Sequence, residues 1–144
     1  MTLPILARGD DWLVVAKPPR LAIHRSEQVR DRVTLVSLLG RQLGQHVHPV
    51  HRLDRAASGC LLLVLHPSLI APFQARLAQG HKTYVALTRG FFRWDDPVDV
   101  RSPMADDKGL VRDAHTIVDA LGRAHEPRCS LVRARPTTGR YHQV

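Results

Sequence analysis

The sequence of 144 residues predicts an α+β fold with a mainly antiparallel sheet flanked by helices and loops. Hydrophobic residues make up 44% of the chain, a share typical of folded globular proteins. Two segments repeat apolar residues at helical spacing, whereas others alternate with the period of two that indicates strands. Because no internal repeat and no linker interrupts the chain, we expect one domain over residues 1–144.

The first third of the chain predicts a turn, a strand and a helix. The turn covers residues 8–11, and an apolar strand follows at 12–16, ended by two prolines. Thr34 suits the N-cap of a helix, and Gly44 suits its end. Between them, leucines recur at spacings of three and four, at positions 35, 38, 39 and 43.

The remaining elements alternate between strand and loop patterns after one more helix. The continuous apolar run at 60–65 predicts a strand buried on both faces, and 68–79 predicts a helix with Pro72 in its first turn. Residues 82–90 alternate with period two and predict a strand that ends at Gly90. We expect further strands at 114–120 and 129–135, and loops at 101–112 and 121–128.

The charge of the chain favours a polyanionic partner. There are 21 Lys and Arg against 13 Asp and Glu, a net charge of +8, and all but three of these cations are arginines. Arginine forms forked hydrogen bonds with phosphate and stacks on bases. The cations are spread evenly along the chain, so nucleic acid is the first expected partner and anionic lipid the second. A general bias of the source towards arginine would also produce this composition.

Two further compositional features bear on location. Cys60 and Cys129 are too few for a disulfide framework or a four-cysteine zinc site, and we expect both to be buried as small apolar residues. The sequence has neither a signal-peptide pattern nor an apolar run of 18 residues. We therefore expect a cytoplasmic and soluble protein. We also expect a monomer and no membrane partner.

Residues 44–59 are the densest run of chemically active side chains. Asp54 lies between Arg52 and Arg55, whose charges are expected to keep its carboxylate ionised. An ionised and positioned aspartate can act as a nucleophile or as a base. A turn that caps the following strand is the structural alternative.

A metal site is the competing interpretation of the same run. His46, His48 and His51 form an HxHxxH pattern, which resembles the zinc motif HxHxDH of metallo-β-lactamase-like hydrolases. However, Val50 stands where that motif requires aspartate, and the neighbouring arginines would repel a dication. We therefore expect no metal at this site. We expect the three histidines to form a solvated cluster near an RNA backbone.

Four motifs in order give the chain a family resemblance. HRLDRAASGCLLL at 51–63 resembles the HRLDxxTSGxLLL signature of the RNA pseudouridine synthases of the large-subunit ribosomal and tRNA type. The segments at 10–26, 82–90 and 137–144 are similar to the family's opening segment, its KxYxAxxxG strand and its TGRxHQ motif. The resemblance implies the pseudouridine synthase catalytic fold, with a mixed, mainly antiparallel sheet, and no metal or cofactor.

The resemblance also implies roles for the site. Asp54 would be the catalytic carboxylate, as a nucleophile or as a base, and Arg52 would fill the gap left by a flipped base. Tyr84 would stack on the uracil, the alternative being an aromatic residue on the core face of a strand. Arg140 would pair with Asp54, the alternative being a surface contact to phosphate.

Other motif residues are expected to bind RNA or support the site. Together with Arg52, we expect Arg55, Lys17 and Lys82 to contact RNA, although both lysines could instead be structural. His142 and Gln143 are expected to support the turn that carries the arginine of TGRxHQ.

The substrate and the extent of the fold follow from finer features. Residues 23–28, 43–47 and the HRLDR run look most like the family members that modify uridine 65 of tRNA, with ribosomal RNA as the alternative substrate. Ala57 replaces the usual threonine, and Val144 lies inside the last motif. We therefore expect a catalytic domain that is incomplete at its C-terminal end and lacks an S4 domain. A non-catalytic RNA-binding fragment is the second hypothesis and a zinc-dependent hydrolase the third.

Overall fold

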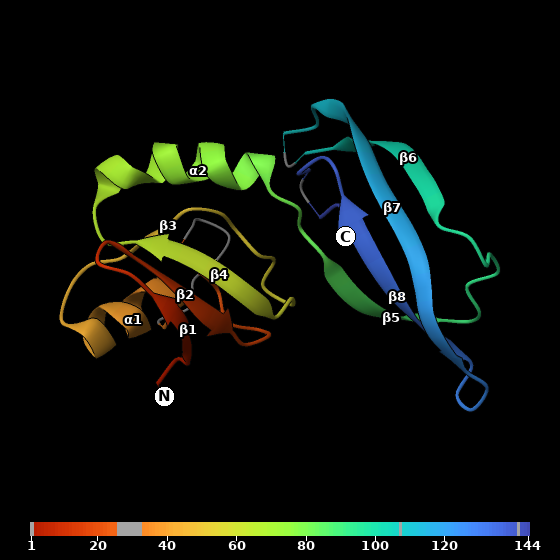
Figure 1. The fold of residues 1–144 in the computed structure, drawn as a ribbon, viewed down its shortest axis with the longest axis horizontal. Coiled ribbons are helices and arrows are strands. Elements are labelled where there is room, and N and C mark those ends of the chain that lie inside the picture. Colours follow the sequence, from red (N-terminus) through yellow and green to blue (C-terminus); the bar gives the residue numbers. More distant parts are fainter. Residues whose placement is uncertain (1, 26–32, 107, 141) are drawn as a thin grey trace. The chain divides into compact units, whose positions relative to one another are not determined.

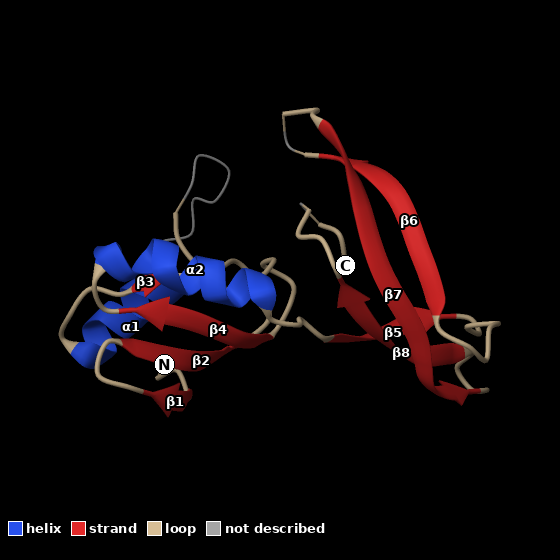
Figure 2. Ribbon diagram, turned by 45° about the horizontal axis from the view of Figure 1, so that its top comes forward, coloured by secondary structure: helices blue, strands red, loops and turns tan. Residues whose placement is uncertain are grey.

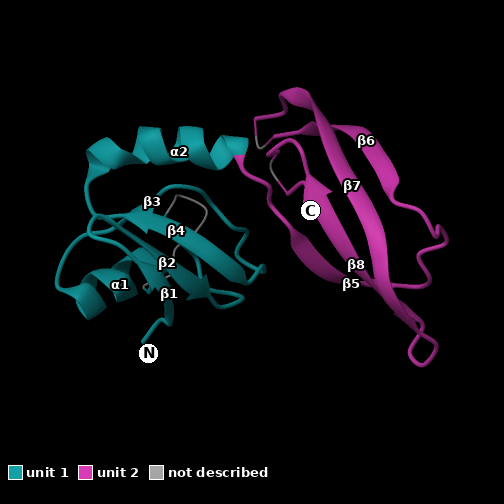
Figure 3. Ribbon diagram, viewed as in Figure 1, with its two compact units in different colours: residues 1–79 teal, residues 80–144 magenta. Residues whose placement is uncertain are grey.

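The computed structural model describes the chain except for residues 1, 26–32, 107 and 141 (Figure 1). The described residues form two compact units, 1–79 and 80–144 (Figure 3). Each unit contains one four-stranded sheet, and every strand pairing recorded in the described residues is antiparallel. The α+β class is confirmed, although none of these pairings is the parallel one that a mixed sheet requires. That residues 1–144 act as one catalytic domain remains a prediction.

The first unit is a sheet with two helices, in the strand order β1-β2-β4-β3 (Figure 2). Strands β2 and β4 pair along their whole length, from Trp12 opposite Val64 to Lys17 opposite Gly59. Strands β1 and β3 are short and were not predicted. The elements are β1 (Ile5–Arg8), β2 (Trp12–Lys17), α1 (Leu35–Leu43), β3 (His48–Pro49), β4 (Gly59–Val64), a 3-10 turn η1 (Pro67–Leu69) and α2 (Ile70–Gln79).

Helix α1 begins and ends where the sequence predicts. The backbone N–H of Ser37 donates to Thr34 Oγ1, and the N–H of Thr34 donates to Ser37 Oγ, which completes a capping box. Gly44 ends the helix with a φ of 69°, a left-handed conformation that glycine adopts without steric cost. Local side-chain chemistry was therefore sufficient to predict this helix.

The core of the first unit lies between α1 and one face of the sheet. Leucines 35 and 39 of α1 pack in one cluster with Leu13 and Val15 of β2 and with Leu61 and Leu63 of β4. On the opposite face of β4, Val64 is buried but Leu62 is only partly buried, so the predicted burial on both faces is present only at the end of the strand. Cys60 and Cys129 depart from the expectation of burial, since Cys60 is exposed and Cys129 is only partly buried.

The second unit is an antiparallel sheet in the order β5-β8-β7-β6, in which β6, β7 and β8 are successive neighbours and β5 pairs with β8. Its strands are β5 (Tyr84–Arg89), β6 (Val98–Ala105), β7 (Val111–Ala124) and β8 (Cys129–Pro136). The loop expected at 101–112 is wrong for most of its length, because β6 and β7 pair from Val98 opposite Val118 to Ala105 opposite Val111. The loop expected at 121–128 is wrong for its first half, where β7 continues to Ala124 and pairs with β8. Pro103 is tolerated because β6 is an edge strand.

No helix in the described parts of the chain is long and apolar enough to cross a membrane.

Candidate active site

The HRLD segment forms a loop between β3 and β4 in the first unit. Its start is fixed by β4, since the N–H of Val50 donates to the carbonyl of Leu62 and the N–H of Leu62 donates to His51 Nε2. The N–H of Ala57 donates to the carbonyl of Asp54 over 3.1 Å, which closes a tight turn. The half-buried Asp54 is therefore carried by a loop with a defined backbone.

Lys17 anchors this loop through hydrogen bonds to its backbone. As the last residue of β2, it lies on the same face as Leu13 and Val15, and only 1% of its surface is exposed. Its ammonium donates to three carbonyl oxygens, those of Pro18 at 3.0 Å, Arg55 at 3.2 Å and Ala57 at 2.7 Å. Two of these three carbonyls belong to the segment just after Asp54.

The electrostatics of Lys17 follow from this position. Burial lowers the pKa of Lys17 below its usual value, and the nearby negative charge of Asp54 acts in the opposite direction. An ammonium has three protons, and here three carbonyls accept them. Lys17 was expected to be a residue that contacts RNA or holds the structure. Its burial and its filled donors support the structural role and leave no donor for a phosphate.

The arginines of the loop lie at its surface. The N–H of Arg20 donates to the carbonyl of Arg55 over 2.7 Å, and Arg55 Nε donates back to the carbonyl of Arg20. Arg20 has a φ of 65°, so a strained residue holds this contact. Arg52 and Arg55 are both exposed, as RNA contacts require.

The three histidines of the HxHxxH pattern do not form a ligand set. The rings of His46 and His48 meet edge to face with centroids 4.7 Å apart, and the pKa of His48 is lowered by burial and then by His46 and His66. The Nε2 atom of His51 accepts the N–H of Leu62. Among the described residues, no group of three or more His, Cys, Asp or Glu side chains could hold a metal.

Tyr84 and Lys82 belong to the second unit. Tyr84 is the first residue of β5 and lies opposite Ala134 of β8. It is half-buried, whereas its neighbour Val85 on the other face is 60% exposed, so the predicted alternation is present. Lys82, which precedes the strand, is also half-buried.

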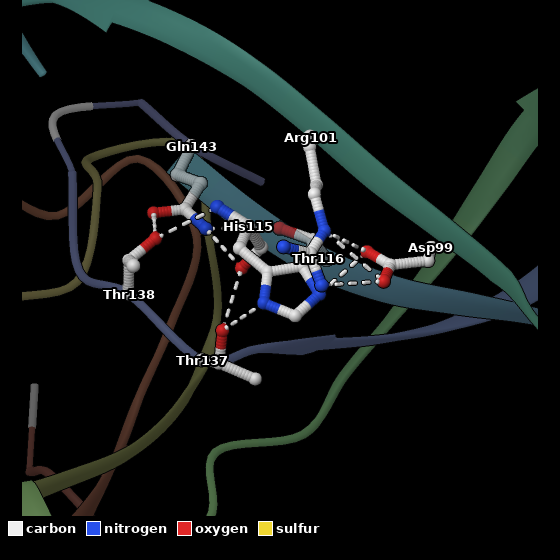
Figure 4. A network of polar contacts seen from close by, with 7 residues as sticks. All are labelled: Asp99, Arg101, His115, Thr116, Thr137, Thr138 and Gln143. Carbon is white, nitrogen blue, oxygen red and sulfur yellow. Dashed lines mark hydrogen bonds and ion pairs between the residues drawn. The ribbon is translucent and has the colours of Figure 1, made fainter. Parts of the chain in front are cut away.

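Gln143 organises the turn of the TGRxHQ motif (Figure 4). Its Oε1 accepts hydrogen bonds from Thr138 Oγ1 and from the N–H of Arg140, both over 2.9 Å. Its Nε2 donates to the carbonyl of His115 and to Thr116 Oγ1, also over 2.9 Å. The amide uses both of its donors and two acceptor positions. These bonds confirm the supporting role expected of Gln143.

The side chain of Arg140 is also held within the second unit. Its Nε donates to the carbonyl of Asp113 over 2.8 Å. The expected partner, Asp54, belongs to the first unit, so pairing of Arg140 with Asp54 remains a prediction.

Sequence reasoning missed a group that supports the same turn. His115 contacts Thr137 Oγ1 through Nδ1 at 2.7 Å and Asp99 Oδ1 through Nε2 (Figure 4). Arg101 also binds Asp99, and this hydrogen bond is the main cause of the lowered pKa of that carboxyl. The signal was hidden because Asp99 and Arg101 lie on β6, most of which was expected to be loop.

Comparison with known proteins decides the family. The sequence profile described as RNA pseudouridylate synthase matches residues 11–144. The chain belongs to the RNA pseudouridylate synthase family. This result confirms the resemblance drawn from the four motifs.

Relatives of this synthase family include several bacterial proteins. The chain is 35% identical to tRNA pseudouridine synthase C of Pasteurella multocida, with 100% of the chain and 68% of the relative aligned. It is 33% identical to tRNA pseudouridine synthase C of Yersinia pestis, over 99% of the chain and 63% of the relative. For tRNA pseudouridine synthase C of Pectobacterium carotovorum the identity is 32%, over 99% of the chain and 43% of the relative. The chain thus spans 43–68% of the length of these relatives.

Solved structures of the family share the fold. Human RNA Pseudouridylate Synthase Domain Containing 1 superimposes with a TM-score of 0.80 at 24% identity, covering 99% of this chain and 62% of that one. Human RNA Pseudouridylate Synthase Domain Containing 4 superimposes with a TM-score of 0.73 at 23% identity, covering 97% and 61%. The pseudouridine synthase fold is thereby confirmed.

Proposed function

We propose that this chain is the catalytic part of an RNA pseudouridine synthase that acts on tRNA, with uridine 65 as its target. The observation that carries the proposal is the Asp54 loop, which a buried lysine fixes within a chain that belongs to this family. The names of the relatives support tRNA as the RNA. The net charge of +8 supports a polyanionic substrate, and the cytoplasm remains the expected location.

The proposed reaction is an isomerisation. The bond between ribose C1′ and uracil N1 breaks, the base turns, and a bond between C1′ and C5 forms. C5 loses a proton and N1 gains one, so atoms and electrons balance without a cofactor. In this scheme Asp54 acts either as the nucleophile or as the base that removes a ribose proton.

The remaining site residues are proposed to expose and hold the base. A uridine stacked in an RNA stem must be flipped out, and unstacking costs a few kcal/mol that protein contacts offset. Arg52 is exposed on the Asp54 loop, where it can fill the gap left by the base. We assign stacking on the uracil to Tyr84 and pairing with the Asp54 carboxylate to Arg140.

Chemical mapping of pseudouridine tests this function. A tRNA transcript with uridine at position 65 is incubated with the wild-type chain, with Asp54→Asn, and with Asp10→Asn as the matched control. Asp10 is exposed in the turn between β1 and β2. We expect modification at position 65 with wild type and Asp10→Asn, and none with Asp54→Asn, whose tRNA affinity stays within about threefold.

Each other outcome contradicts a defined part of the proposal. Turnover by Asp54→Asn would remove Asp54 from its role. Modification of a ribosomal RNA fragment but not of tRNA would overturn the substrate. Tight binding of tRNA by wild type without any pseudouridine would instead support the non-catalytic RNA-binding alternative.

A further inference from the structure

A cluster of aromatic and basic side chains lies at one end of the second sheet, outside all four family motifs. It follows the end of β5 and faces the hairpin between β7 and β8. A cavity of about 340 Å³ opens there. We call this cluster the FFRW patch, and it consists of Phe91, Phe92, Arg93, Trp94, Arg123, His125 and Arg128.

The backbone of the FFRW patch is anchored to the sheet. The N–H of Gly90 donates to the carbonyl of Arg128 over 3.0 Å. Ser130, which is fully buried, accepts the N–H of Phe92 over 2.8 Å and donates to the carbonyl of Gly90 over 3.0 Å. Because these anchors use backbone atoms of the 90–92 segment, its side chains are left to face the cavity.

The aromatic side chains form two sets of contacts. The guanidinium of Arg128 lies 5.2 Å from the centroid of the Phe91 ring, and His125 meets the same ring edge to face. Phe92 and Trp94 meet edge to face with centroids 5.2 Å apart. Trp94 is 56% exposed, although exposing an indole is unfavourable. Three of the seven aromatic residues of the chain are gathered in these four positions.

Charge at the rim of the patch is mixed. Arg93 and Arg123 line the cavity, and Arg123 also donates to the carbonyl of Trp94 and to Asp95. Asp96 and Glu126 lie nearby in sequence. Such a surface suits one or two phosphates beside a stacking platform, and does not suit the continuous row of phosphates along a duplex.

We propose that the FFRW patch binds one unpaired nucleotide of the RNA substrate. The base packs against Phe92 and Trp94, and its phosphate lies at Arg93 and Arg123. A volume of about 340 Å³ falls in the usual range of ligand pockets, about 300–1,000 Å³. Aromatic side chains accept any base because every base has a π face. The RNA identity of the ligand rests on the proposed function.

The patch is separate from the proposed uracil contact. Tyr84 is at the start of β5, and Gly90 follows its end. Six residues of extended chain span roughly 20 Å. The nucleotide in the patch is therefore not the target uridine but one several positions away from it.

Tryptophan fluorescence tests this inference directly. The chain has two tryptophans, so Trp12→Phe leaves Trp94 as the only one. We expect a ten-nucleotide oligouridylate to quench Trp94 with saturation. A blunt duplex of two fully complementary ten-nucleotide RNA strands, compared at the same concentration of phosphates, should quench it little. Equal quenching by both RNAs, or none by either, would overturn the proposal; a patch that docks a protein predicts none by either.

Substitutions give a second measurement. Trp94→Ala keeps the carbonyl that Arg123 binds, and we expect it to weaken oligouridylate binding at least about fivefold in fluorescence anisotropy. Arg93→Ala should lower the slope of log affinity against log salt by about 0.7. Arg41→Ala, on the exposed side of α1, is the matched control and should change neither. Unchanged binding by Trp94→Ala would contradict the proposal.

Pseudouridine formation and quenching of Trp94 test the proposed activity and the FFRW patch independently. In Asp54→Asn, pseudouridine formation should be lost while quenching of Trp94 persists. Pseudouridine formation by a wild-type chain whose Trp94 is not quenched would overturn the patch alone. Quenching without pseudouridine formation by wild type would overturn the proposed activity alone.

Discussion

Replacing Lys17 by methionine isolates the contribution of one buried ammonium to the Asp54 loop. Methionine keeps most of the apolar stem but removes the ammonium that donates to the carbonyls of Pro18, Arg55 and Ala57. The carbonyl of Arg55 keeps the N–H of Arg20 as a donor, so the main cost falls on the carbonyls of Pro18 and Ala57. An unsatisfied buried acceptor costs about 1–3 kcal/mol. Methionine also avoids the free-energy cost of burying a charged group, which offsets part of this loss. We expect Lys17→Met to lower the free energy of unfolding of the first unit by about 2–4 kcal/mol.

The effect on activity should exceed the effect on RNA binding. Two of the three carbonyls follow Asp54 closely, and a displacement of about 1 Å at a reacting group can cost roughly 100-fold in rate. We therefore expect kcat for pseudouridine formation to fall by about that factor, while tRNA affinity stays within about threefold. A residue that contacted phosphate would instead change affinity and the salt dependence of binding.

Urea unfolding followed by tryptophan fluorescence measures the stability change. In a Trp94→Phe background the signal comes from Trp12, which lies on β2 with Lys17. Lys82→Met is the matched control, because Lys82 is only half-buried and precedes its strand. Stability within about 0.5 kcal/mol of wild type, together with full activity, would refute the assigned role of Lys17.

Two further predictions concern the second unit. Gln143→Leu removes four hydrogen bonds, two within the TGRxHQ turn and two from the turn to β7. We therefore expect the free energy of unfolding to fall by about 2–4 kcal/mol in urea unfolding followed through Trp94, and unchanged stability would contradict this role of Gln143. The pKa of Asp119 is held below its usual 3.8, mainly by a hydrogen bond from Arg133. A lowered folded-state pKa contributes stability above pH 3.8 that is lost as the pH falls through the folded value. We expect the free energy of unfolding to decline below pH 3.8 in wild type and less in Asp119→Asn; parallel acid titrations would exclude this contribution.

The elements that the sequence predicted are those with local signals. Helix α1 follows from the Thr34 cap, the leucine spacing and Gly44, all within one short segment. Strands β2 and β4 follow from apolar runs, and β5 and β8 from alternation with period two. Each of these signals lies within the element itself, so the element can be predicted without knowing its partners in the fold.

The elements that were missed depend on distant partners. Strand β3 has two residues, and it exists because His48 lies opposite Val64 of β4. Strand β6 contains Asp, Arg, Ser and Pro, which suggest a loop, yet β7 pairs with all eight of its residues. The support that His115 and Asp99 give to the turn was missed for the same reason. Pairing energy between strands is not visible in the composition of one strand.

The structure also separates the motif residues that support the site from those that are exposed to a substrate. Lys17 and Gln143 stand in two different motifs and units, and each gives its N–H donors to protein acceptors, mostly backbone carbonyls. A side chain whose donors are filled inside the protein has none left for a substrate. Arg52 on the Asp54 loop is exposed, and its contact with RNA remains a prediction. A sequence motif alone does not show which of its polar residues support the fold and which are available to a substrate. Burial of the side chain and occupancy of its hydrogen-bond donors distinguish these two roles.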